Sequence, residues 1–360
     1  MTELLTRGKD CMLIIQPSLP TYREAFFCEL AETLKKEITI LHFSKKSNIK
    51  HPLIKEIIGN FINLNGIKYI KNINKFIKKE STIITVFDPH WINLFTLPLF
   101  SRKKNIILWG HGAGKSTLVN HLRIPFINKA NCIITYSEER KKKLLNLNIK
   151  DKKIYVANNT LDVPNSQDTS QKSKKNFLYV GRLQRRKKLD VFFNIFKELA
   201  LDRKGYDITI IGDGDEEKKF LENHILKLGI KKSVEFKPGT SSEKILLENF
   251  SSATYYVSPG AVGLGVLHSF AYGVPVLTMK DPAHGPEVSN IQEGINGYIF
   301  SDQIDFKNKL INILDSNTAT TMGKNSFIYY QENRTIQKMV EEFIQAIHSN
   351  SLKNEQKNSN

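Results

Sequence analysis

Two cations follow a predicted strand in the second half of the chain. In "FLYVGRLQRRKKLD" an apolar strand begins at Phe177 and ends at Gly181, and Arg182 and Lys187 follow, five residues apart. The carboxyl end of a strand in an open α/β sheet is where ligands bind. Because a guanidinium and an ammonium group together match the charge of a diphosphate, this pair predicts an anion site.

Two more strand ends in this half offer backbone rather than side chains. "IIGDGDEEKKF" ends a strand in the turn Gly212–Asp213–Gly214, which brings the backbone close to a ligand. "VSPGAVGLGVLHSFAYGVPV" ends a strand at Pro259 and continues through Gly260 and the run Gly263, Leu264 and Gly265 into a short helix over 266–272. Amide N–H groups at a helix start bind phosphate. The three segments together predict a site for a nucleoside diphosphate between two domains.

A fourth glycine-rich stretch, "ILWGHGAGKSTLVN" over 107–120, looks like the phosphate loop of an ATPase but has a different spacing. That loop needs four residues between its first glycine and the Gly–Lys pair, and only three separate Gly110 from Gly114. Trp109 stands where the glycine belongs, and its indole would fill the phosphate position. We therefore interpret Lys115 as an ordinary loop lysine and His111 as an imidazole presented at a strand end.

The elements that must position these residues follow a βαβ rhythm. Short apolar runs alternate with longer amphipathic stretches, which is typical of parallel sheets covered by helices. The 360 residues, 40% of them hydrophobic, suffice for two domains. A polar stretch over 163–176 separates two series of strands. The predicted strands of the first series are Met12–Gln16, Ile38–Phe43, Ile83–Phe87, Asn105–Trp109 and Cys132–Tyr136.

Positive charge is concentrated in the first half of the chain. Of the net charge of +17, residues 1–150 contribute 25 basic and 11 acidic residues, and the remainder contributes 28 and 25. Over 45–79, lysines alternate with isoleucine and phenylalanine at roughly helical spacing. Such a segment suits an anionic membrane surface or a solvated helix face. The aromatic pattern of RNA-binding modules is missing, so we expect no nucleic-acid partner.

The remaining composition bears on cofactors and location. Cys11, Cys28 and Cys132 have no metal-ligand spacing, and we expect reduced, mostly buried thiols. No Asp-x-Asp pair stands in a suitable loop, so no metal or other cofactor is predicted. No apolar run approaches 18 residues, and the N-terminal apolar patch is too short for a signal peptide. We expect a cytoplasmic protein, with peripheral attachment to the inner face of the cell membrane left open.

The second half resembles the donor domain of the family 4, or group 1, glycosyltransferases. The resemblance rests on "GRLQRRKK", "IIGDGDEE", "VEFKPG", "YYVSPG", "GVPVL" and "GPEVSNIQEGINGYIF", which appear in the order of that family over about 130 residues. The first half resembles the acceptor domain of bacterial polysaccharide enzymes more loosely, through "PSLPTYREAFFCEL", "WGHG" and "NCIITYSEERKKKLL". The resemblance implies an α/β fold of GT-B type, with two Rossmann-like domains facing each other across a cleft.

Domain roles follow from this resemblance, and the polar stretch 163–176 sets the boundary between the domains. We expect an acceptor-binding domain over 1–165 and a domain over 176–320 that binds the nucleotide-sugar donor. Helices over 321–350 are expected to pack back toward the first domain, and a disordered tail is expected over 351–360.

The resemblance also implies residue roles. Arg182 and Lys187 would neutralise the donor diphosphate without a metal ion, aided by the backbone of Gly263, Leu264 and Gly265. His111 would be the catalytic residue, donating a hydrogen bond or carrying a proton at the donor sugar. Further residues would contact the nucleotide or the sugar: Gly181, Gly212, Asp213, Gly260, His268 and Glu287.

The sequence departs from the family at one point. Family members usually carry two glutamates with seven residues between them at the glycine loop, and here Gly260 and His268 stand in those places. Glu287, in the later Pro–Glu turn, or the neighbouring His284 would have to compensate.

The expected function is therefore a hexosyl or deoxyhexosyl transfer from a nucleoside-diphosphate sugar to a growing surface polysaccharide or a lipid-linked oligosaccharide, as in lipopolysaccharide biosynthesis. A glycan or polyprenyl-linked acceptor is implied, and retention of configuration follows from the family alone. The missing glutamates keep open a non-catalytic sugar-nucleotide-binding protein, and the architecture keeps open a sugar-nucleotide epimerase.

Overall fold

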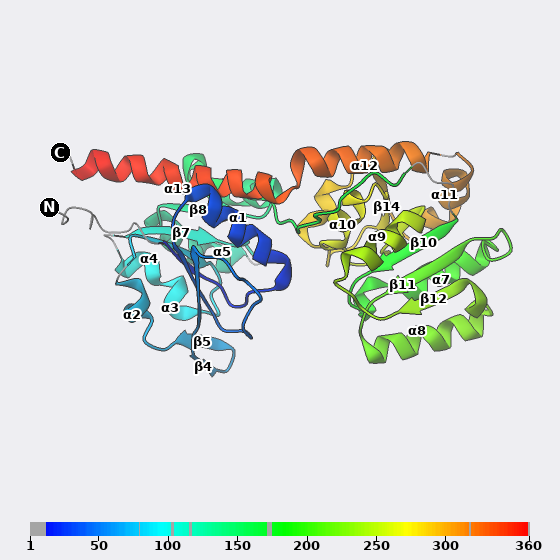
Figure 1. Ribbon diagram of the computed structural model, residues 1–360, viewed down its shortest axis with the longest axis horizontal. Helices are drawn as coiled ribbons and strands as arrows, with labels where there is room; N and C mark the ends of the chain where they lie inside the picture. The colour runs from blue at the N-terminus through cyan, green and yellow to red at the C-terminus, as the bar shows by residue number, and fades with distance from the viewer. Residues whose placement is uncertain are drawn as a thin grey trace. The chain divides into compact units, whose positions relative to one another are not determined.

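The fold is described from a computed structural model, which covers residues 12–358 apart from 79, 102–103, 115–116, 171–174 and 317, with backbone alone for 117–118 and 349–358. Cys11 and Lys115 lie outside the described residues. The chain forms two compact units, Met1–Asp162 with Ile336–Asn360, and Val163–Thr335 (Figure 1). The prediction of two Rossmann-like α/β domains is confirmed.

Unit 1 is built on a parallel sheet of seven strands in the order β3-β2-β1-β6-β7-β8-β9. Its central strands β1, β7 and β8 are buried along their whole length, as expected of a sheet covered on both faces. The strands are β1 Met12–Ile15, β2 Ile38–His42, β3 Ile54–Ile58, β6 Thr82–Val86, β7 Asn105–Trp109, β8 Cys132–Thr135 and β9 Ile154–Val156.

Helices cover both faces of this sheet, and each face has its own hydrophobic core. Helices α1 (Glu24–Leu34) and α13 (Ile336–Asn358) bury one face, where Phe26 of α1 packs edge-on against Phe343 of α13 at 4.8 Å. The other face is covered by five helices. They are α2 Ile73–Ile77, α3 Ile92–Phe95, α4 Leu97–Phe100, α5 Thr117–Lys129 and α6 Glu138–Leu145.

The helical interpretation of residues 45–79 is wrong. The segment forms β3 and then an antiparallel hairpin of β4 (Phe61–Leu64) and β5 (Ile67–Ile70), and within its described residues 45–78 only α2 is helical. The turn residues Asn65 and Gly66 have φ values of 49° and 88°, the left-handed pair that a tight hairpin turn requires. The Asn–Gly turn and the isoleucine-rich flanks therefore outweigh the lysine spacing.

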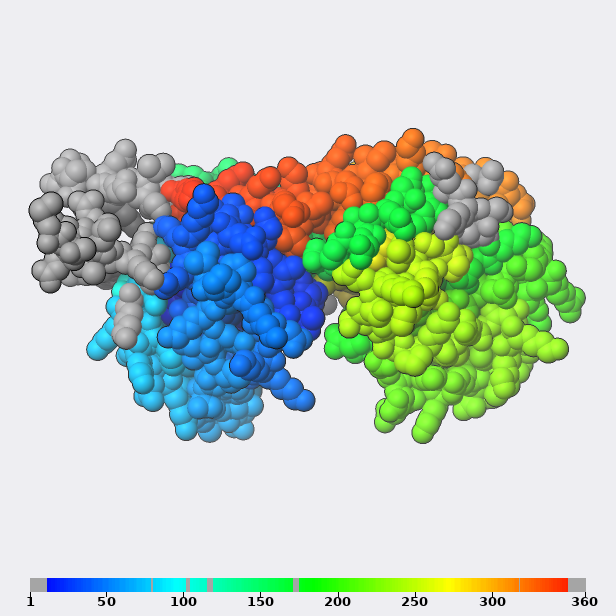
Figure 2. Space-filling view, viewed as in Figure 1, coloured from blue at the N-terminus to red at the C-terminus, as the bar shows by residue number. Residues whose placement is uncertain are grey.

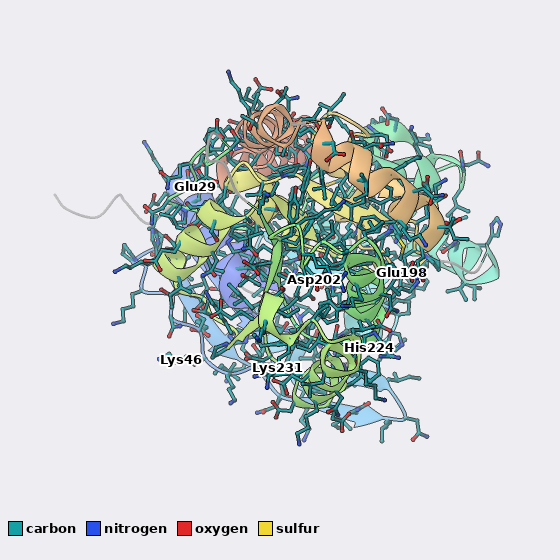
Figure 3. All side chains as sticks on the ribbon, turned by 90° about the vertical axis from the view of Figure 1, so that its right-hand side faces the viewer. Glu29, Lys46, Glu198, Asp202, His224 and Lys231 are labelled. Carbon is teal, nitrogen blue, oxygen red and sulfur yellow. The ribbon has the colours of Figure 1, made fainter. Side chains whose placement is uncertain are left out.

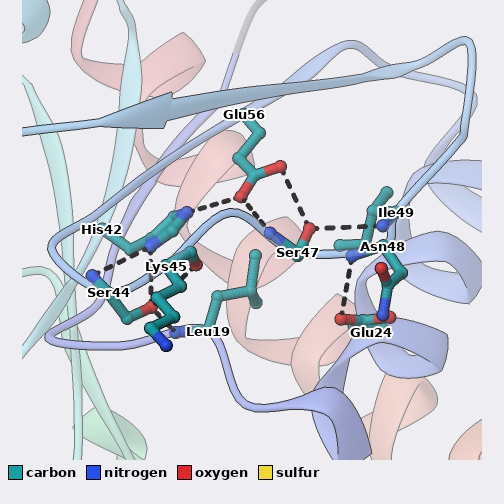
Figure 4. Close-up of polar contacts among 9 residues, drawn as sticks. All are labelled: Leu19, Glu24, His42, Ser44, Lys45, Ser47, Asn48, Ile49 and Glu56. Carbon is teal, nitrogen blue, oxygen red and sulfur yellow. Dashed lines mark hydrogen bonds and ion pairs between the residues drawn. The ribbon is translucent and has the colours of Figure 1, made fainter.

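A buried polar network fixes the chain that leads into the hairpin (Figure 4). His42, at the end of β2, is fully buried, and its Nε2 lies 2.7 Å from Oε1 of Glu56 while its Nδ1 lies 3.0 Å from Oγ of Ser44. The Glu56 carboxylate also accepts hydrogen bonds from the amide and the hydroxyl of Ser47. These bonds tie β2, the loop after it and β3 into one piece, on which the hairpin is mounted.

Unit 2 contains a parallel sheet of six strands in the order β12-β11-β10-β13-β14-β15. The order reverses between β10 and β13, which places the topological switch point of the sheet there. The strands are β10 Asn176–Val180, β11 Asp207–Ile211, β12 Val234–Lys237, β13 Tyr255–Val257, β14 Val276–Met279 and β15 Gly297–Phe300.

Six α-helices accompany these strands in the part of unit 2 that the structure describes. Glu198, at the end of α7, pairs with Lys307 of α11 at 2.7 Å, and His224 of α8 lies 2.9 Å from Asn194 of α7; Figure 3, which faces this unit, shows Glu198 and His224. The helices are α7 Leu189–Glu198, α8 Asp215–Leu228, α9 Glu243–Ser252, α10 Gly265–Ala271, α11 Gln303–Asp315 and α12 Ala319–Asn333.

The segments at the unit boundaries differ in detail from the expected ones. Part of the polar stretch 163–176 packs on unit 2, since Thr169 is buried and donates a hydrogen bond to the carbonyl of Tyr272 at 2.7 Å. Of the expected terminal helices over 321–350, α12 belongs to unit 2 and α13 to unit 1. Helix α13 continues to Asn358, within the stretch 351–360 that we expected to be disordered.

Candidate functional site

The predicted donor residues lie at one edge of the unit 2 sheet. The segments that follow β10, β11, β12 and β13 all leave the carboxyl ends of parallel strands. Arg182 and Lys187 follow β10, and the glycine loop 260–265 follows β13, on the two sides of the switch point. This is the place where open α/β sheets bind ligands.

Hydrogen bonds lock the Arg–Lys loop onto the glycine loop. Nζ of Lys187 donates to the carbonyl of Ala261 at 2.6 Å. In return, the amides of Gly260 and Ala261 donate to the carbonyls of Lys187 and Arg186, both at 2.9 Å. A Cβ at residue 260 would overlap the Arg186 carbonyl oxygen, so only glycine fits. The close backbone packing at residue 260 thus explains why the family's first glutamate is absent from this position.

In the rest of the glycine loop the amide of Val262 is engaged, whereas the three amides after it have no acceptor among the described residues. The amide of Val262 donates to Nδ1 of His284 at 3.1 Å, and Nε2 of His284 lies 2.7 Å from the Met279 carbonyl oxygen. His284 is therefore a neutral imidazole that holds the loop in place. Among the described residues, none accepts a hydrogen bond from the amides of Gly263, Leu264 or Gly265, and a Cβ at Gly263 would meet open space. Three consecutive free N–H groups can bind an anion.

Electrostatics favour an anion at this loop. Burial, together with the neighbouring guanidinium groups of Arg186 and Arg182, lowers the pKa of Lys187 to about 8. The buried carboxylate of Glu287, in the turn Pro286–Asn290, acts in the opposite direction on the same ammonium. The Arg182 side chain is exposed, and no described residue accepts a hydrogen bond from its guanidinium group. A bound diphosphate would relieve the repulsion among these cations.

A separate pocket of about 360 Å³ opens at the ends of β10, β11 and β12. It brings together the predicted residues Gly181, Arg182, Gly212 and Asp213. It also includes the run Gly239, Thr240 and Ser241, which the sequence analysis did not assign. Asp213 accepts a hydrogen bond from the amide of Gly239 at 2.8 Å and so joins the two rims. The Pro–Gly turn that follows the strand "VEFK" was the available signal for this rim.

His268 has a different environment from the one expected of a ribose or phosphate ligand. Its ring lies 5.0 Å from the ring of Phe250 and 5.7 Å from that of Tyr272, and no described residue is hydrogen-bonded to its ring nitrogens. Burial lowers the pKa of His268 to about 4. The imidazole is therefore neutral near pH 7 and packs as an aromatic ring.

His111 belongs to unit 1, at the carboxyl end of β7. Its imidazole is exposed and packs edge-on against Tyr136, with ring centroids 5.0 Å apart. Partial burial and the guanidinium groups of Arg140, Arg23 and Arg123 lower its pKa, while Asp88 acts in the opposite direction. His111 is thus neutral near pH 7 and available as a hydrogen-bond donor or a base.

The loop after His111 is held by side chains of its own unit. The carbonyls of Gly112, Ala113 and Gly114 accept hydrogen bonds from Arg123, Arg140 and Asn120, respectively. The amide of Gly114 donates to Asn120 at 2.7 Å, and Trp109 is fully buried beneath the loop. The Gly114 amide is thus engaged, and an indole stands where a phosphate loop has its first glycine, in agreement with the spacing argument.

Within the described part of the chain, no group of three or more His, Cys, Asp or Glu side chains is arranged to hold a metal ion. None of the helices described there has the length and apolar character needed to cross a bilayer. Cys132 is buried and Cys28 is half-buried.

Comparison with known sequences places the second half in a family. Residues 165–334 match the model of "Glycosyl transferases group 1". A 41.2 kDa protein of the cps region of Klebsiella pneumoniae, itself named as uncharacterized, is 27% identical over 202 residues, which are 53% of this chain and 52% of that protein. An uncharacterized glycosyltransferase of Haemophilus influenzae is 27% identical over 163 residues, 40% of this chain and 45% of that one. The chain thus spans about half the length of the curated relatives it matches.

Solved structures share the two-unit fold over almost the whole chain. A glycosyltransferase from Rickettsia africae superposes with a TM-score of 0.71 at 17% identity, covering 94% of this chain and 97% of the other. Anabaena HepE in complex with UDP-glucose gives a TM-score of 0.69 at 13% identity, with 94% and 99% covered. The lipopolysaccharide outer core galactosyltransferase WaaB gives 0.67 at 17% identity, with 94% and 99% covered. Residues 165–334 are thus similar to the group 1 glycosyltransferases, and the two Rossmann-like units share the GT-B fold of these solved structures.

Proposed function

We propose that this protein transfers a sugar from a nucleoside-diphosphate sugar to the acceptor of a surface-polysaccharide pathway. The observation that carries the proposal is the run of free amides at Gly263, Leu264 and Gly265 beside the Lys187 ammonium. HepE, which shares the fold, binds UDP-glucose, and one sequence relative is encoded in a cps region. The family match supports glycosyl transfer over nucleotide binding alone.

In the proposed reaction, the diphosphate lies against the glycine loop and the nucleoside occupies the pocket lined by Gly181, Gly212 and Asp213. Arg182 and Lys187 stabilise the charge that grows on the leaving diphosphate as the glycosidic bond breaks. Because these two cations supply that charge, we propose that no metal ion is required. His111 donates a hydrogen bond to the transferred sugar or carries a proton, and Glu287 takes over part of the missing glutamate's role. By analogy with the family, the configuration is retained.

Thermal stabilisation by nucleotides tests the donor part of this proposal. A ligand that binds only the folded state raises the melting temperature, so UDP, GDP, ADP and CMP, with their sugars and with EDTA present, are compared on the pure protein. One nucleoside diphosphate should raise the melting temperature, and Arg182→Gln should abolish that shift. Sugar release from the matching donor then separates an enzyme from a binding protein. A shift that appears only with ATP and magnesium would contradict the proposal.

The hairpin of unit 1 supports attachment to an anionic membrane as a second part of the function. In the β4–β5 register Ile62 lies opposite Tyr69 and Leu64 opposite Ile67, so these four side chains share one face of the hairpin. They are 41%, 51%, 69% and 54% exposed, respectively. The other face carries Phe61, whose ring packs at 5.0 Å against Trp91. Figure 2 shows this segment at the lower surface of unit 1.

The charges around the hairpin match this partner. Lys55, Lys71, Lys75 and Lys78 flank it, and the one acid of the segment 54–78, Glu56, is engaged by His42 and Ser47. An apolar face bordered by lysines binds a bilayer through both burial of apolar surface and attraction to anionic headgroups. We therefore propose that the face formed by Ile62, Leu64, Ile67 and Tyr69 inserts at the membrane interface, near a polyprenyl-linked acceptor.

A further inference from the structure

Arg23, which follows β1 in the short turn Thr21–Arg23, is a buried cation without an acidic partner. It is 9% exposed, and its guanidinium carbon lies 4.4 Å above the ring of Trp109. It forms two long hydrogen bonds, to Oε1 of Gln16 at 3.4 Å and to the hydroxyl of Tyr136 at 3.3 Å, and the hydroxyl of Tyr22 also acts on it. None of these neutral groups supplies a negative charge. Burying an unpaired ion is strongly unfavourable, so we expect an anion to bind beside this guanidinium group.

Unused donors gather at the same place. Nε of Arg23, Nε2 of Gln16 and Nε1 of Trp109 are buried, and none has a hydrogen-bond partner among the described residues. Gln16 follows β1, and Trp109 ends β7. Buried polar groups are rarely left unsatisfied. Three donors without an acceptor, next to a buried guanidinium, point to a missing acceptor group.

Two more arginines stand around the neighbouring His111. Arg123 reaches the carbonyl of Gly112 at 3.1 Å and Arg140 that of Ala113 at 2.9 Å, so both guanidinium groups border the loop that carries His111. Tyr136 links the two parts, because it contacts both Arg23 and His111. Asp88 is the acid whose charge acts on His111, and its carboxylate is already engaged by His90 at 2.7 Å. The surplus at this edge is therefore positive.

We propose that Arg23, His111, Arg123, Tyr136 and Arg140, together called the Arg23 cluster, bind a phosphate group of the sugar acceptor. Three guanidinium groups suit a dianionic phosphate better than a single carboxylate. The cluster lies at the carboxyl edge of the unit 1 sheet, after β1, β7 and β8, where open sheets bind ligands. The inference rests on the proposed sugar transfer and assigns the acceptor a phosphate next to the sugar-accepting end.

The His111 imidazole offers a local readout of this site. Its pKa is followed by NMR on histidine-labelled full-length protein, with the resonance assigned by its loss in His111→Gln. Inorganic phosphate should raise the pKa of His111, because a nearby anion favours the imidazolium form. Titration with phosphate at fixed pH gives the dissociation constant. An unchanged His111 pKa at the highest soluble phosphate concentration would overturn the proposal.

Variants connect the effect to the cluster. Arg23→Gln should weaken phosphate binding at least about ten-fold, as expected for loss of a charge-assisted hydrogen bond. Arg140→Gln, at a half-exposed helix position, keeps the test valid if Arg23→Gln does not fold. Lys142→Gln removes the same charge from an exposed position of the same helix and should have no effect. Equal phosphate binding in all three variants would exclude the cluster as the site.

Two further ligands identify the source of the phosphate. Geranyl phosphate should bind more tightly than inorganic phosphate if the group belongs to a polyprenyl-linked acceptor, and equal or weaker binding would overturn that assignment. Glucuronate tests a sugar carboxylate, and binding stronger than that of phosphate would also contradict the proposal. UDP stabilisation should survive Arg23→Gln, so a failed acceptor site and a failed donor site give different results.

Discussion

The Lys187 ammonium and the Ala261 carbonyl, joined by a hydrogen bond of 2.6 Å, connect the two loops that meet at the switch point of the unit 2 sheet. A lysine whose only described acceptor is one carbonyl keeps two N–H groups available, since an ammonium group has three donors. The same contact holds the glycine loop so that its next amides stay free. Lys187 therefore has both a structural role and a ligand-binding role.

Replacing Lys187 tests its ligand-binding role. Lys187→Gln should weaken binding of the matching nucleoside diphosphate by about 10- to 100-fold, because a charge-assisted contact of about 1.5–3 kcal/mol is lost. Isothermal titration calorimetry measures this change. Lys197→Gln, at a half-exposed position of α7, removes the same charge and serves as control. Equal affinities of the two variants would remove Lys187 from the donor site.

The pH dependence of donor binding follows from the same group. Its pKa of about 8 in the free protein means that the ammonium loses its proton above that pH, so nucleoside-diphosphate affinity should fall as pH rises through 8. Folding stability should change in the opposite direction. The unfolded chain holds this proton up to about pH 10.5, so stability should rise between pH 8 and 10.5.

An arginine at this position provides the test. Lys187→Arg retains its charge over the whole range, so the fall in affinity above pH 8 should disappear in this variant. Calorimetric affinities at several pH values in both proteins check this. If the wild-type affinity is constant from pH 7 to 10, Lys187 does not contact the diphosphate as an ammonium.

Restoring the family's glutamate at residue 260 should damage the protein. Gly260→Glu brings a Cβ onto the Arg186 carbonyl, so the loop must move, and we expect a loss of about 2–4 kcal/mol in unfolding free energy. Gly263→Ala, where the added methyl group meets open space, should change stability by less than about 1 kcal/mol. Urea denaturation of both variants measures this contrast. A stable, more active Gly260→Glu protein would show that the loop adapts.

His111 is predicted to act on turnover rather than on donor binding. His111→Gln should lower kcat by about 10²- to 10⁴-fold, the usual contribution of a proton-transferring side chain, with the donor affinity unchanged. Because the pKa of His111 is lowered, its imidazole is protonated only at a pH more acidic than that of an ordinary histidine. Activity should therefore persist to that more acidic pH. His121→Gln, at an exposed position of α5, is the matched control. Equal kcat values for the two variants would contradict the assignment.

The sequence predicted the α/β architecture because buried parallel strands are continuous apolar runs, as in β1 and β7. It also predicted the strand ends that carry Arg182, Gly212 and Gly260, since glycines mark where backbones approach closely. It did not predict the hairpin, because lysine spacing over 45–79 was given more weight than the Asn65–Gly66 turn. The aromatic environment of His268 depends on Phe250, which is distant in sequence, and on Tyr272, at the end of the same helix. The Arg23 cluster consists of residues that follow three different strands. Only tertiary packing brings such groups together, so the sequence did not predict either environment.

Replacing the apolar face of the hairpin tests membrane attachment. Leu64→Glu with Ile67→Glu should abolish recovery with vesicles that contain anionic lipid, because two exposed apolar side chains are replaced by charges repelled by the headgroups. Both side chains are exposed, so the melting temperature should stay unchanged. Asn63→Glu, on the opposite face of the hairpin, is the control for added charge.

Salt separates the two contributions to this binding. Lys71→Gln with Lys75→Gln should weaken vesicle recovery at low ionic strength and matter less at high salt, since screening already removes the attraction. The protein with Leu64→Glu and Ile67→Glu should bind vesicles poorly at both low and high ionic strength. Wild-type recovery of the Leu64→Glu and Ile67→Glu protein would exclude the hairpin as the membrane contact. A change from dimer to monomer in that variant would instead identify a second copy of the chain as its partner.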